Sequence, residues 1–200
     1  AQEAPFYLQA LGQLATTEPP AGSAPDHYRY DPADPTPNLG GALLSIEAGR
    51  VDNRPLEARP DVLTYTTEPL SEPLTVIGHV RLRLYVRSSL EHTDFYGRLC
   101  DVGVDGRSLN VCDGLFRVQP GRGESQPDGS LLVEVDMTAT AYRFLPGHRL
   151  RLQVSSGAHP RLSRNLGTGE PVMHGTEMRI AHQTIYHDPN HPSALILPLM

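Results

Sequence analysis

The sequence predicts an all-β protein: an antiparallel sandwich of two sheets, of the jelly-roll type, with an irregular proline-rich N-terminal arm. Three observations support this prediction. Proline and glycine are abundant, at 19 and 18 of the 200 residues. Apolar and polar residues alternate with a period of two in several segments, as in strands with one buried face. Helical periodicity is almost absent, which is typical of a β-protein with many turns.

The proline pattern divides the chain into residues 1–60, an extended arm, and residues 61–200, the sandwich. Proline removes a backbone donor and fixes φ, so the proline-rich stretch 16–60 cannot supply a run of central strands. It carries too many apolar side chains to be a free linker. We therefore expect the arm to press against a surface, which could belong to a domain that precedes this chain. The short apolar piece Phe6–Leu8 is expected to be extended.

Alternation predicts the remaining strands and one long loop. About eight strands are expected in all, antiparallel throughout, with one helical turn near residues 138–140. The loop Ser155–Thr176 has no periodicity, and a loop of this length in a compact domain is either functional or docked on a partner. The strands outside the central hairpin and the N-terminal piece are Val62–Tyr65, Val80–Val86, Leu131–Met137, Leu150–Val154, Ala181–Tyr186 and Ser193–Leu199.

Residues 93–118 are predicted to form a long β-hairpin that turns at Asp105-Gly106, a dipeptide that tolerates the positive φ of a tight turn. A two-residue loop brings opposite charges, two glycines and two aromatic residues together, which supports this register. The expected pairs are Phe95 with Phe116, Gly97 with Gly114, Arg98 with Asp113, Cys100 with Val111, Val102 with Leu109, and Val104 with Arg107.

This register places the two cysteines, Cys100 and Cys112, on opposite faces of the hairpin. A disulfide needs Cβ atoms about 4 Å apart and pointing at each other. We therefore expect two buried free thiols, which a reducing, cytoplasmic location permits. A catalytic role is disfavoured because neither cysteine has a base nearby in the sequence.

Composition excludes several classes of function. The formal net charge is −6, and all 17 basic residues are arginine, which argues against nucleic acid as a partner. No apolar run approaches the roughly 20 residues of a membrane span, and no signal peptide opens the chain. A cytoplasmic protein without a membrane or nucleic-acid partner is the resulting expectation.

The sequence carries no familiar catalytic or nucleotide-binding motif. G-x-S-x-G, the P-loop and G-x-G-x-x-G are all absent, so no catalytic residue is assigned and no cofactor is expected. A carbohydrate-binding face needs exposed flat aromatic rings, and the chain has no tryptophan. An independent carbohydrate- or protein-binding module remains the alternative function.

Two clusters of potential metal ligands occur in the sequence, and neither is predicted to bind a metal. The histidine spacing matches no zinc pattern, and residues 187–192 are better interpreted as a turn. The hairpin register assigns one aspartate to the turn and another to an arginine, which argues against calcium. The clusters are His174, His182, His187 and His191, and Asp101, Asp105 and Asp113.

Several sequence blocks resemble the C-terminal domain of the CocE/NonD hydrolases, a family that includes cocaine esterase, α-amino-acid ester hydrolases and, more distantly, X-Pro dipeptidyl-peptidases. The resemblance covers nearly the whole chain. The blocks are Tyr30–Pro35, Arg59–Leu70, Thr93–Phe95, Leu99–Val102, Asn110–Gly114, Phe144–Arg151, Val154–Ser156 and Tyr186–Ser193.

The resemblance implies a galactose-binding-like jelly roll that follows an α/β-hydrolase domain in the same parent chain. The Ser-Asp-His triad would lie upstream, so this chain alone would have no activity. Its role would be to brace the catalytic domain and to close one side of a cleft for an ester, amide or peptide substrate.

The resemblance also implies which residues face the substrate cleft and the neighbouring domain. Asp94, Phe95 and His159 are expected to line the cleft, although Phe95 could equally pack on Phe116 in the core. An exposed apolar patch on the arm could also allow the chain to form a homodimer. The residues expected at the domain interface are Tyr28, Tyr30, Leu39, Arg161 and Arg164.

Overall fold

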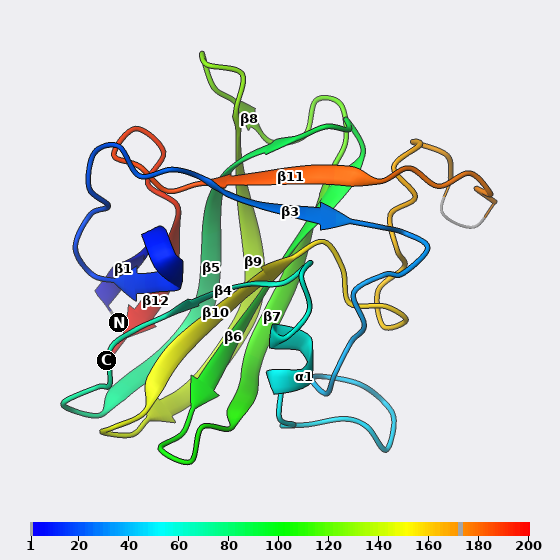
Figure 1. The fold of residues 1–200 in the computed structure, drawn as a ribbon. Helices are drawn as coiled ribbons and strands as arrows, with labels where there is room; N and C mark the ends of the chain where they lie inside the picture. Colours follow the sequence, from blue (N-terminus) through cyan, green and yellow to red (C-terminus); the bar gives the residue numbers. More distant parts are fainter. Residues whose placement is uncertain (1, 172–173) are drawn as a thin grey trace.

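A computed structural model describes residues 2–171 and 174–200 of the chain. In these residues it contains twelve strands and two short helices, so the all-β prediction is confirmed (Figure 1). The helices are η1, a 3₁₀ turn over Ala10–Gly12, and α1 over Arg54–Glu57. The strands are β1 (Gln2–Gln9), β2 (Gln13–Ala15), β3 (Asp26–Tyr30), β4 (Leu63–Thr66), β5 (Leu74–Ser88), β6 (Thr93–Val102), β7 (Ser108–Val118), β8 (Glu124–Ser125), β9 (Leu131–Phe144), β10 (Arg149–Ser155), β11 (Ala181–Tyr186) and β12 (Ala194–Leu199).

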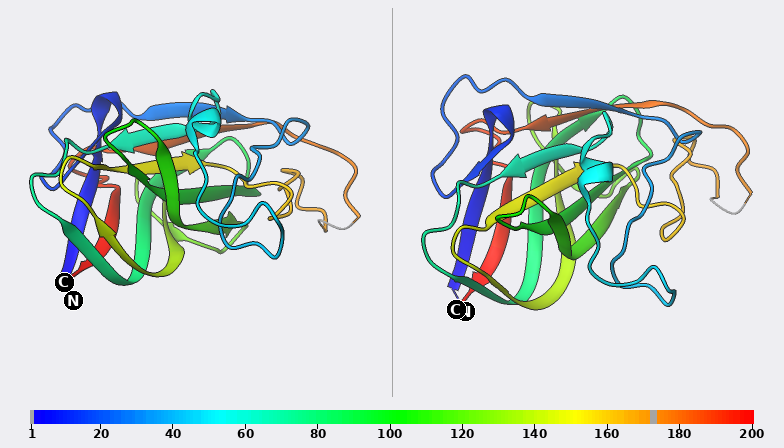
Figure 2. Two further views of the ribbon diagram at one scale, coloured as in Figure 1. Left: turned by 90° about the horizontal axis from the view of Figure 1, so that it is seen from below. Right: turned by 60° about the horizontal axis from the view of Figure 1, so that its bottom comes forward.

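Hydrogen bonds join all twelve strands into one sheet. Its main order is β3-β11-β5-β12-β1-β2-β4-β10-β6-β7, and β9 pairs with β5 and β8. The pairing is antiparallel except for one parallel contact between β2 and β4. Strands β1 and β12 pair along their length, which brings the described ends of the chain together, as Figure 2 shows. The jelly-roll connectivity itself stays a prediction.

The sheet folds over so that the β6–β7 hairpin lies against β5 and β9. A side chain added at Gly97 would meet Leu82 and Met137, and one added at Gly114 would meet the backbone of Asp136. The apolar core lies between these layers. It includes the fully buried residues Val80, Leu82, Leu84, Phe95, Leu99, Val135, Met137, Phe144, Leu150, Leu152 and Val154.

The hairpin register is half correct. Phe95 pairs with Phe116, Gly97 with Gly114, and Arg98 with Asp113, as predicted. Beyond Leu99 the register shifts by one residue at a bulge. The pairs there are Cys100 with Asn110, Asp101 with Leu109, and Val102 with Ser108.

The bulge arises because the turn is longer than two residues and because the arm binds the end of β7. The N–H of Gly103 donates to the carbonyl of Arg107 at 3.0 Å, so residues 104–106 form the loop. The side-chain oxygen of Asn110 accepts the N–H of Val51 at 2.9 Å. Sequence reasoning about two strands could not include this third segment. The predicted pairs of Val111, Leu109 and Arg107 are therefore wrong.

Residues 1–60, the predicted arm, contribute three strands to the sheet as well as irregular segments. Strand β1 lies inside the sheet between β12 and β2, and β3 forms an edge beside β11. The predicted helical turn at residues 138–140 is wrong because these residues belong to β9, where Thr138 has a positive φ of 68°. The one α-helical turn, α1, lies in the arm, and its first turn contains proline, whose φ suits that position.

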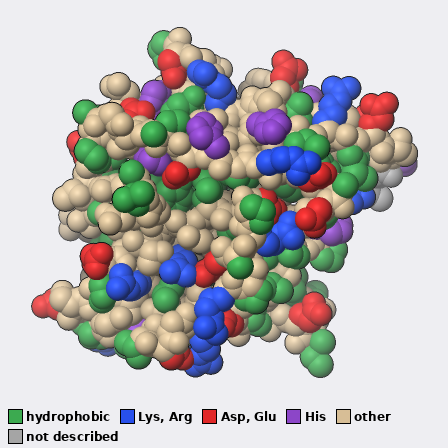
Figure 3. Space-filling model, in the orientation of Figure 1, with side chains coloured by type: hydrophobic (Ala, Val, Ile, Leu, Met, Phe, Trp, Pro, Cys, Tyr) green, Lys and Arg blue, Asp and Glu red, His purple; other side chains and the backbone are tan. Residues whose placement is uncertain are grey.

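The long loop between β10 and β11 is confirmed over its described residues, and its residues 172 and 173 lie outside the described part. Cys100 and Cys112 are both buried free thiols, as predicted. Neither described helix has the length or hydropathy of a membrane-spanning segment. On the face drawn in Figure 3, acidic and basic side chains are interspersed.

Candidate functional site

Asp94, a predicted cleft residue, joins the start of β6 to the β10–β11 loop. Its carboxylate is only 1% exposed. Arg117 donates to both carboxylate oxygens, at 2.9 and 2.7 Å, and the amide of Asn165 donates at 2.8 Å. Arg117 also donates to the carbonyl of Ser163 at 2.7 Å. The two predicted cleft segments are therefore neighbours, and the Asp94 carboxylate holds them together.

His159, the second predicted cleft residue, fastens the same loop to the arm. Its N–H donates to the carbonyl of Thr36 at 2.9 Å, and its carbonyl accepts the N–H of Asn38 at 2.8 Å. The buried ring atom Nδ1 has no hydrogen-bond partner in the described structure. His159 borders a cavity of about 180 Å³, which is lined by His159, Ser163, Arg164, Leu166 and Gly175.

Phe95, the third predicted cleft residue, has no exposed surface. Its side chain belongs to the core cluster, and the partly buried Phe116, its cross-strand partner, packs against that cluster. This arrangement agrees with the alternative expectation, that Phe95 packs in the core. Phe95 also borders a cavity of about 250 Å³, together with Val118 and Leu131. A direct contact of Phe95 with substrate stays a prediction.

The exposed patch predicted from the arm tyrosines is not found. Tyr28 and Tyr30 are 5% and 1% exposed, because β3 lies with these side chains against the core. The hydroxyls of Tyr28 and Ser156 are 2.9 Å apart and hydrogen-bonded. Burial raises the pKa of Tyr28 above its usual value. These two tyrosines therefore cannot form the exposed apolar patch from which a homodimer was expected.

The two loop arginines, expected at the domain interface, make contacts within this chain. Arg161 forms an ion pair of 2.7 Å with Asp113. Arg164 donates to the carbonyl of Pro32 at 3.0 Å. Both contacts tie the β10–β11 loop to its surroundings. Neither arginine depends on a neighbouring domain for a partner.

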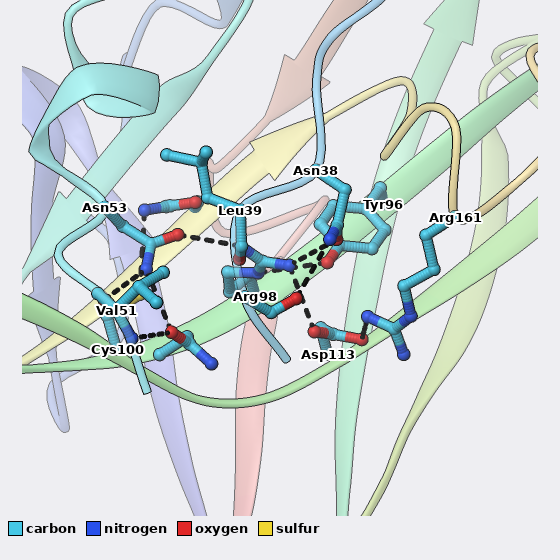
Figure 4. A network of polar contacts seen from close by, with 12 residues as sticks. Asn38, Leu39, Val51, Asn53, Tyr96, Arg98, Cys100, Asp113 and Arg161 are labelled. Carbon is cyan, nitrogen blue, oxygen red and sulfur yellow. Dashed lines mark hydrogen bonds and ion pairs between the residues drawn. The ribbon is translucent and has the colours of Figure 1, made fainter. Parts of the chain in front are cut away.

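Leu39 takes part in a buried polar network through its backbone (Figure 4). The centre of the network is Arg98, whose side chain is 1% exposed. Its Nε donates to the hydroxyl of Tyr96 at 3.0 Å. Its terminal nitrogens contact the carbonyl of Leu39 at 2.5 Å, Oδ1 of Asn53 at 2.7 Å, Oδ1 of Asn38 at 2.9 Å and Oδ2 of Asp113 at 3.3 Å.

This network fixes the arm on the hairpin, and sequence reasoning found only one part of it. The pairing of Arg98 with Asp113 followed from the hairpin register. Asn38 and Asn53 were missed because an asparagine in an irregular segment gives no periodic signal that would place it. A buried arginine needs more hydrogen-bond acceptors than one carboxylate supplies. This requirement indicates that further acceptors, such as the amide oxygens of Asn38 and Asn53, lie near Arg98.

In the described residues, no histidine is hydrogen-bonded both to a carboxylate and to a serine, threonine or cysteine side chain. The His27 ring lies 3.1 Å from the hydroxyl of Thr184, but it has no carboxylate partner among these residues. The closest Asp–His contacts are Asp26 with His187 at 2.9 Å and Asp101 with His148 at 2.8 Å. In the described part of the chain, neither histidine is hydrogen-bonded to a serine, threonine or cysteine. Burial raises the thiol pKa of the two cysteines to about 12, so both are protonated near neutral pH. Residues 2–171 and 174–200 also contain no group of three or more metal-ligating side chains.

Comparison with known proteins gives the chain a family. The model of the X-Pro dipeptidyl-peptidase C-terminal non-catalytic domain matches residues 1–196. Cocaine esterase from Rhodococcus sp. (strain MB1 Bresler) is 41% identical over 213 residues, which cover 98% of this chain and 37% of that protein.

Two solved structures share the fold over the whole chain. An aminopeptidase from a marine sediment archaeon, Thaumarchaeota archaeon, has a TM-score of 0.88 at 29% identity, and 37% of it is covered. An α-amino acid ester hydrolase has a TM-score of 0.87 at 30% identity, and 36% of it is covered. The chain thus spans little more than a third of the length of these relatives. It belongs to the family of X-Pro dipeptidyl-peptidase C-terminal non-catalytic domains, which form the C-terminal part of CocE/NonD-type hydrolases.

Proposed function

We propose that this chain braces the α/β-hydrolase domain of a serine esterase and closes one side of its substrate cleft. The observation that carries the proposal is the match of residues 1–196 to a non-catalytic C-terminal domain. The identity to cocaine esterase, of which the chain covers 37%, favours ester substrates. A nucleophile and base would then come from the preceding domain.

The β10–β11 loop is the part of the chain that we assign to the cleft. Asp94 and Arg117 fix the loop through hydrogen bonds to Asn165 and to the carbonyl of Ser163. The arm fixes it through hydrogen bonds to the backbone of His159. A loop that is fixed on both sides can present a side chain at a constant position, as a rigid cleft wall requires. The half-buried side chain of His159, which borders a cavity of about 180 Å³, is the one that we assign to the substrate.

An esterase assay with p-nitrophenyl esters tests the proposal on this chain and on its full-length parent. We expect turnover by the parent and none by the chain alone. Ester hydrolysis by the 200-residue chain would contradict the non-catalytic assignment. An intact parent that hydrolyses no ester would contradict the proposed parent activity.

The cleft assignment is tested by His159→Ala in the parent. We expect a lower kcat/KM with an unchanged unfolding temperature, because the ring contributes no hydrogen bond to the fold. His182→Ala, an exposed histidine on β11, is the control and should leave kcat/KM unchanged. Equal kinetics for the parent and the His159 variant would remove this loop from the cleft.

A further inference from the structure

A cleft of about 520 Å³ lies where two turns and the arm meet, at the end of the β6–β7 hairpin. The β6–β7 turn forms one wall, the β9–β10 turn forms another, and Arg50 of the arm lies between them. None of the residues predicted to line the substrate cleft belongs to it. Its lining residues are Arg50, Asp101, Gly103, Val104, Asp105, Arg107, Leu109, Tyr142, Arg143, Leu145 and His148.

A buried carboxylate with a hydrogen-bond partner on each of its oxygens forms the floor of the cleft. Asp101, 4% exposed, accepts the hydroxyl of Tyr142 at 2.6 Å and contacts Nδ1 of His148 at 2.8 Å. Arg50 approaches the same carboxylate at 3.6 Å and donates to the Tyr142 hydroxyl at 2.6 Å. Its guanidinium also lies over the Tyr142 ring, 4.9 Å from the centroid. These contacts hold the floor in one arrangement without a ligand.

The remaining charges give the cleft a positive excess. The second carboxylate, Asp105, is paired with Arg107 at 2.6 Å. Arg143 is exposed and makes no ion pair with any described residue. Three guanidinium groups therefore face two paired carboxylates, in a chain whose net charge is −6. An incoming carboxylate would find a free guanidinium donor at Arg143.

Apolar side chains stand at the rim. Val104 on the β6–β7 turn is 81% exposed, and Leu145 on the β9–β10 turn is 50% exposed. Turn tips ordinarily carry polar residues. A cleft with a net positive charge between two apolar tips suits a folded protein surface better than a small ligand, because a protein can cover the rim and fill the cleft together.

We propose that this cleft receives an aspartate or glutamate side chain, flanked by apolar residues, from the α/β-hydrolase domain of the same parent chain. The proposal rests on the proposed function, since it takes that domain as the partner. Two observations select this occupant. The charge of the cleft calls for a carboxylate, and the chain covers only 37% of cocaine esterase, so most of such a parent lies outside the described residues.

Hydroxyl-radical footprinting of the parent and of the isolated chain tests the proposal. We expect Tyr142 and Leu145 to be modified severalfold more slowly in the parent, because the docked domain would shield them. Arg143→Glu in the parent should restore the rate of the isolated chain. The control is Arg122→Glu, beyond the opposite end of β7, which should leave the protection intact. Unchanged unfolding of both variants in the isolated chain shows that the fold is kept.

The outcomes separate this proposal from the proposed function. A parent that hydrolyses esters while Tyr142 and Leu145 react as in the isolated chain would overturn the docking site alone. Protection that survives Arg143→Glu would overturn the role of charge. Protection that appears in the isolated chain as its concentration rises would identify a second copy as the occupant, and would overturn the assignment to the hydrolase domain.

Discussion

Gly97 and Gly114 face each other across the β6–β7 hairpin, at the point where the hairpin lies on β5 and β9. A methyl group at Gly97 would meet the side chains of Leu82 and Met137. One at Gly114 would run into the backbone of Asp136. The pair therefore allows the two layers of the sheet to approach closely, and the backbone contact at Gly114 leaves no flexible group to move aside.

Gly114→Ala is expected to destabilise the fold. Overpacking in a tight core costs about 1–3 kcal/mol, and a backbone neighbour places this site toward the upper end. Because the chain has no tryptophan, urea unfolding should be followed by circular dichroism. The control is Gly157→Ala, whose new methyl group would lie in ordinary contact with Tyr30, at 3.6 Å or more. Equal unfolding midpoints for the two variants would contradict the close-approach explanation.

Arg98→Met is expected to destabilise the chain more than any exposed arginine substitution. The variant keeps most of the side-chain volume but leaves Asn38, Asn53 and Leu39 without their donor. Breaking a buried pair of this kind costs about 3–5 kcal/mol. Arg29→Met, which removes an exposed ion pair, should cost no more than about 1 kcal/mol. A similar loss of unfolding free energy in both variants would show that the network contributes little.

The contact between Asp26 and His187 predicts a pH dependence of stability. Burial lowers the pKa of His187, but the hydrogen bond and charge of Asp26 outweigh it, so the pKa stands above 6.5. Burial raises the pKa of Asp26, but hydrogen bonds from His187 and Tyr65 outweigh it, so the pKa stands below 3.8. The stabilisation is therefore complete between about pH 4 and 6.5 and is lost as the pH rises through the folded pKa of His187.

Asp26→Asn tests this dependence by removing the charge. The difference in unfolding free energy between the unsubstituted 200-residue chain and the variant should be largest near about pH 5.5 and should shrink above about pH 6.5. Asp31→Asn, at an exposed ion pair with Arg29, is the control. Its difference should stay constant above about pH 5.5, because the pKa of Asp31 lies below 3.8 and its partner is an arginine. The prediction would be contradicted if the unfolding free energies of the unsubstituted chain and of Asp26→Asn changed with pH in parallel.

The sequence predicted the fold where two neighbouring strands determine the structure. Opposite charges and paired glycines gave the correct register from Phe95 to Leu99. The prediction failed nearer the turn, because Asn110 also binds the arm and a bulge adapts β7 to it. A third segment, distant in sequence, decided the register there, and no pattern within the hairpin records it.

In the candidate site, too, the sequence identified individual segments but not the contacts between segments that are distant in sequence. Asp94 and the β10–β11 loop were predicted as two separate cleft segments, and hydrogen bonds from Asn165 and Arg117 bring them together. The arm tyrosines were expected on the surface because the proline-rich stretch was interpreted as irregular. The edge strand β3 overturns this, since its alternation turns Tyr28 and Tyr30 inward.

Thr138, a β-branched residue with a positive φ in β9, offers a test by a stabilising substitution. Its φ of 68° lies in the left-handed region, where a β-branched residue is strained by about 1–2 kcal/mol. Glycine would relieve the strain but would lose more chain entropy on folding, by about 0.5–1 kcal/mol. Thr138→Gly should therefore raise the unfolding free energy slightly, by about 0.5–1 kcal/mol.

Thr140→Gly is the matched control, two residues further along β9. Thr140 does not have a positive φ, so glycine there brings only the entropic cost and should lower the unfolding free energy by about 0.5–1 kcal/mol. Opposite signs for the two substitutions in urea unfolding would support the strain at Thr138. A loss of stability in both would show that the bulge at this point, between His79 and Arg81 of the partner strand, accommodates threonine without strain.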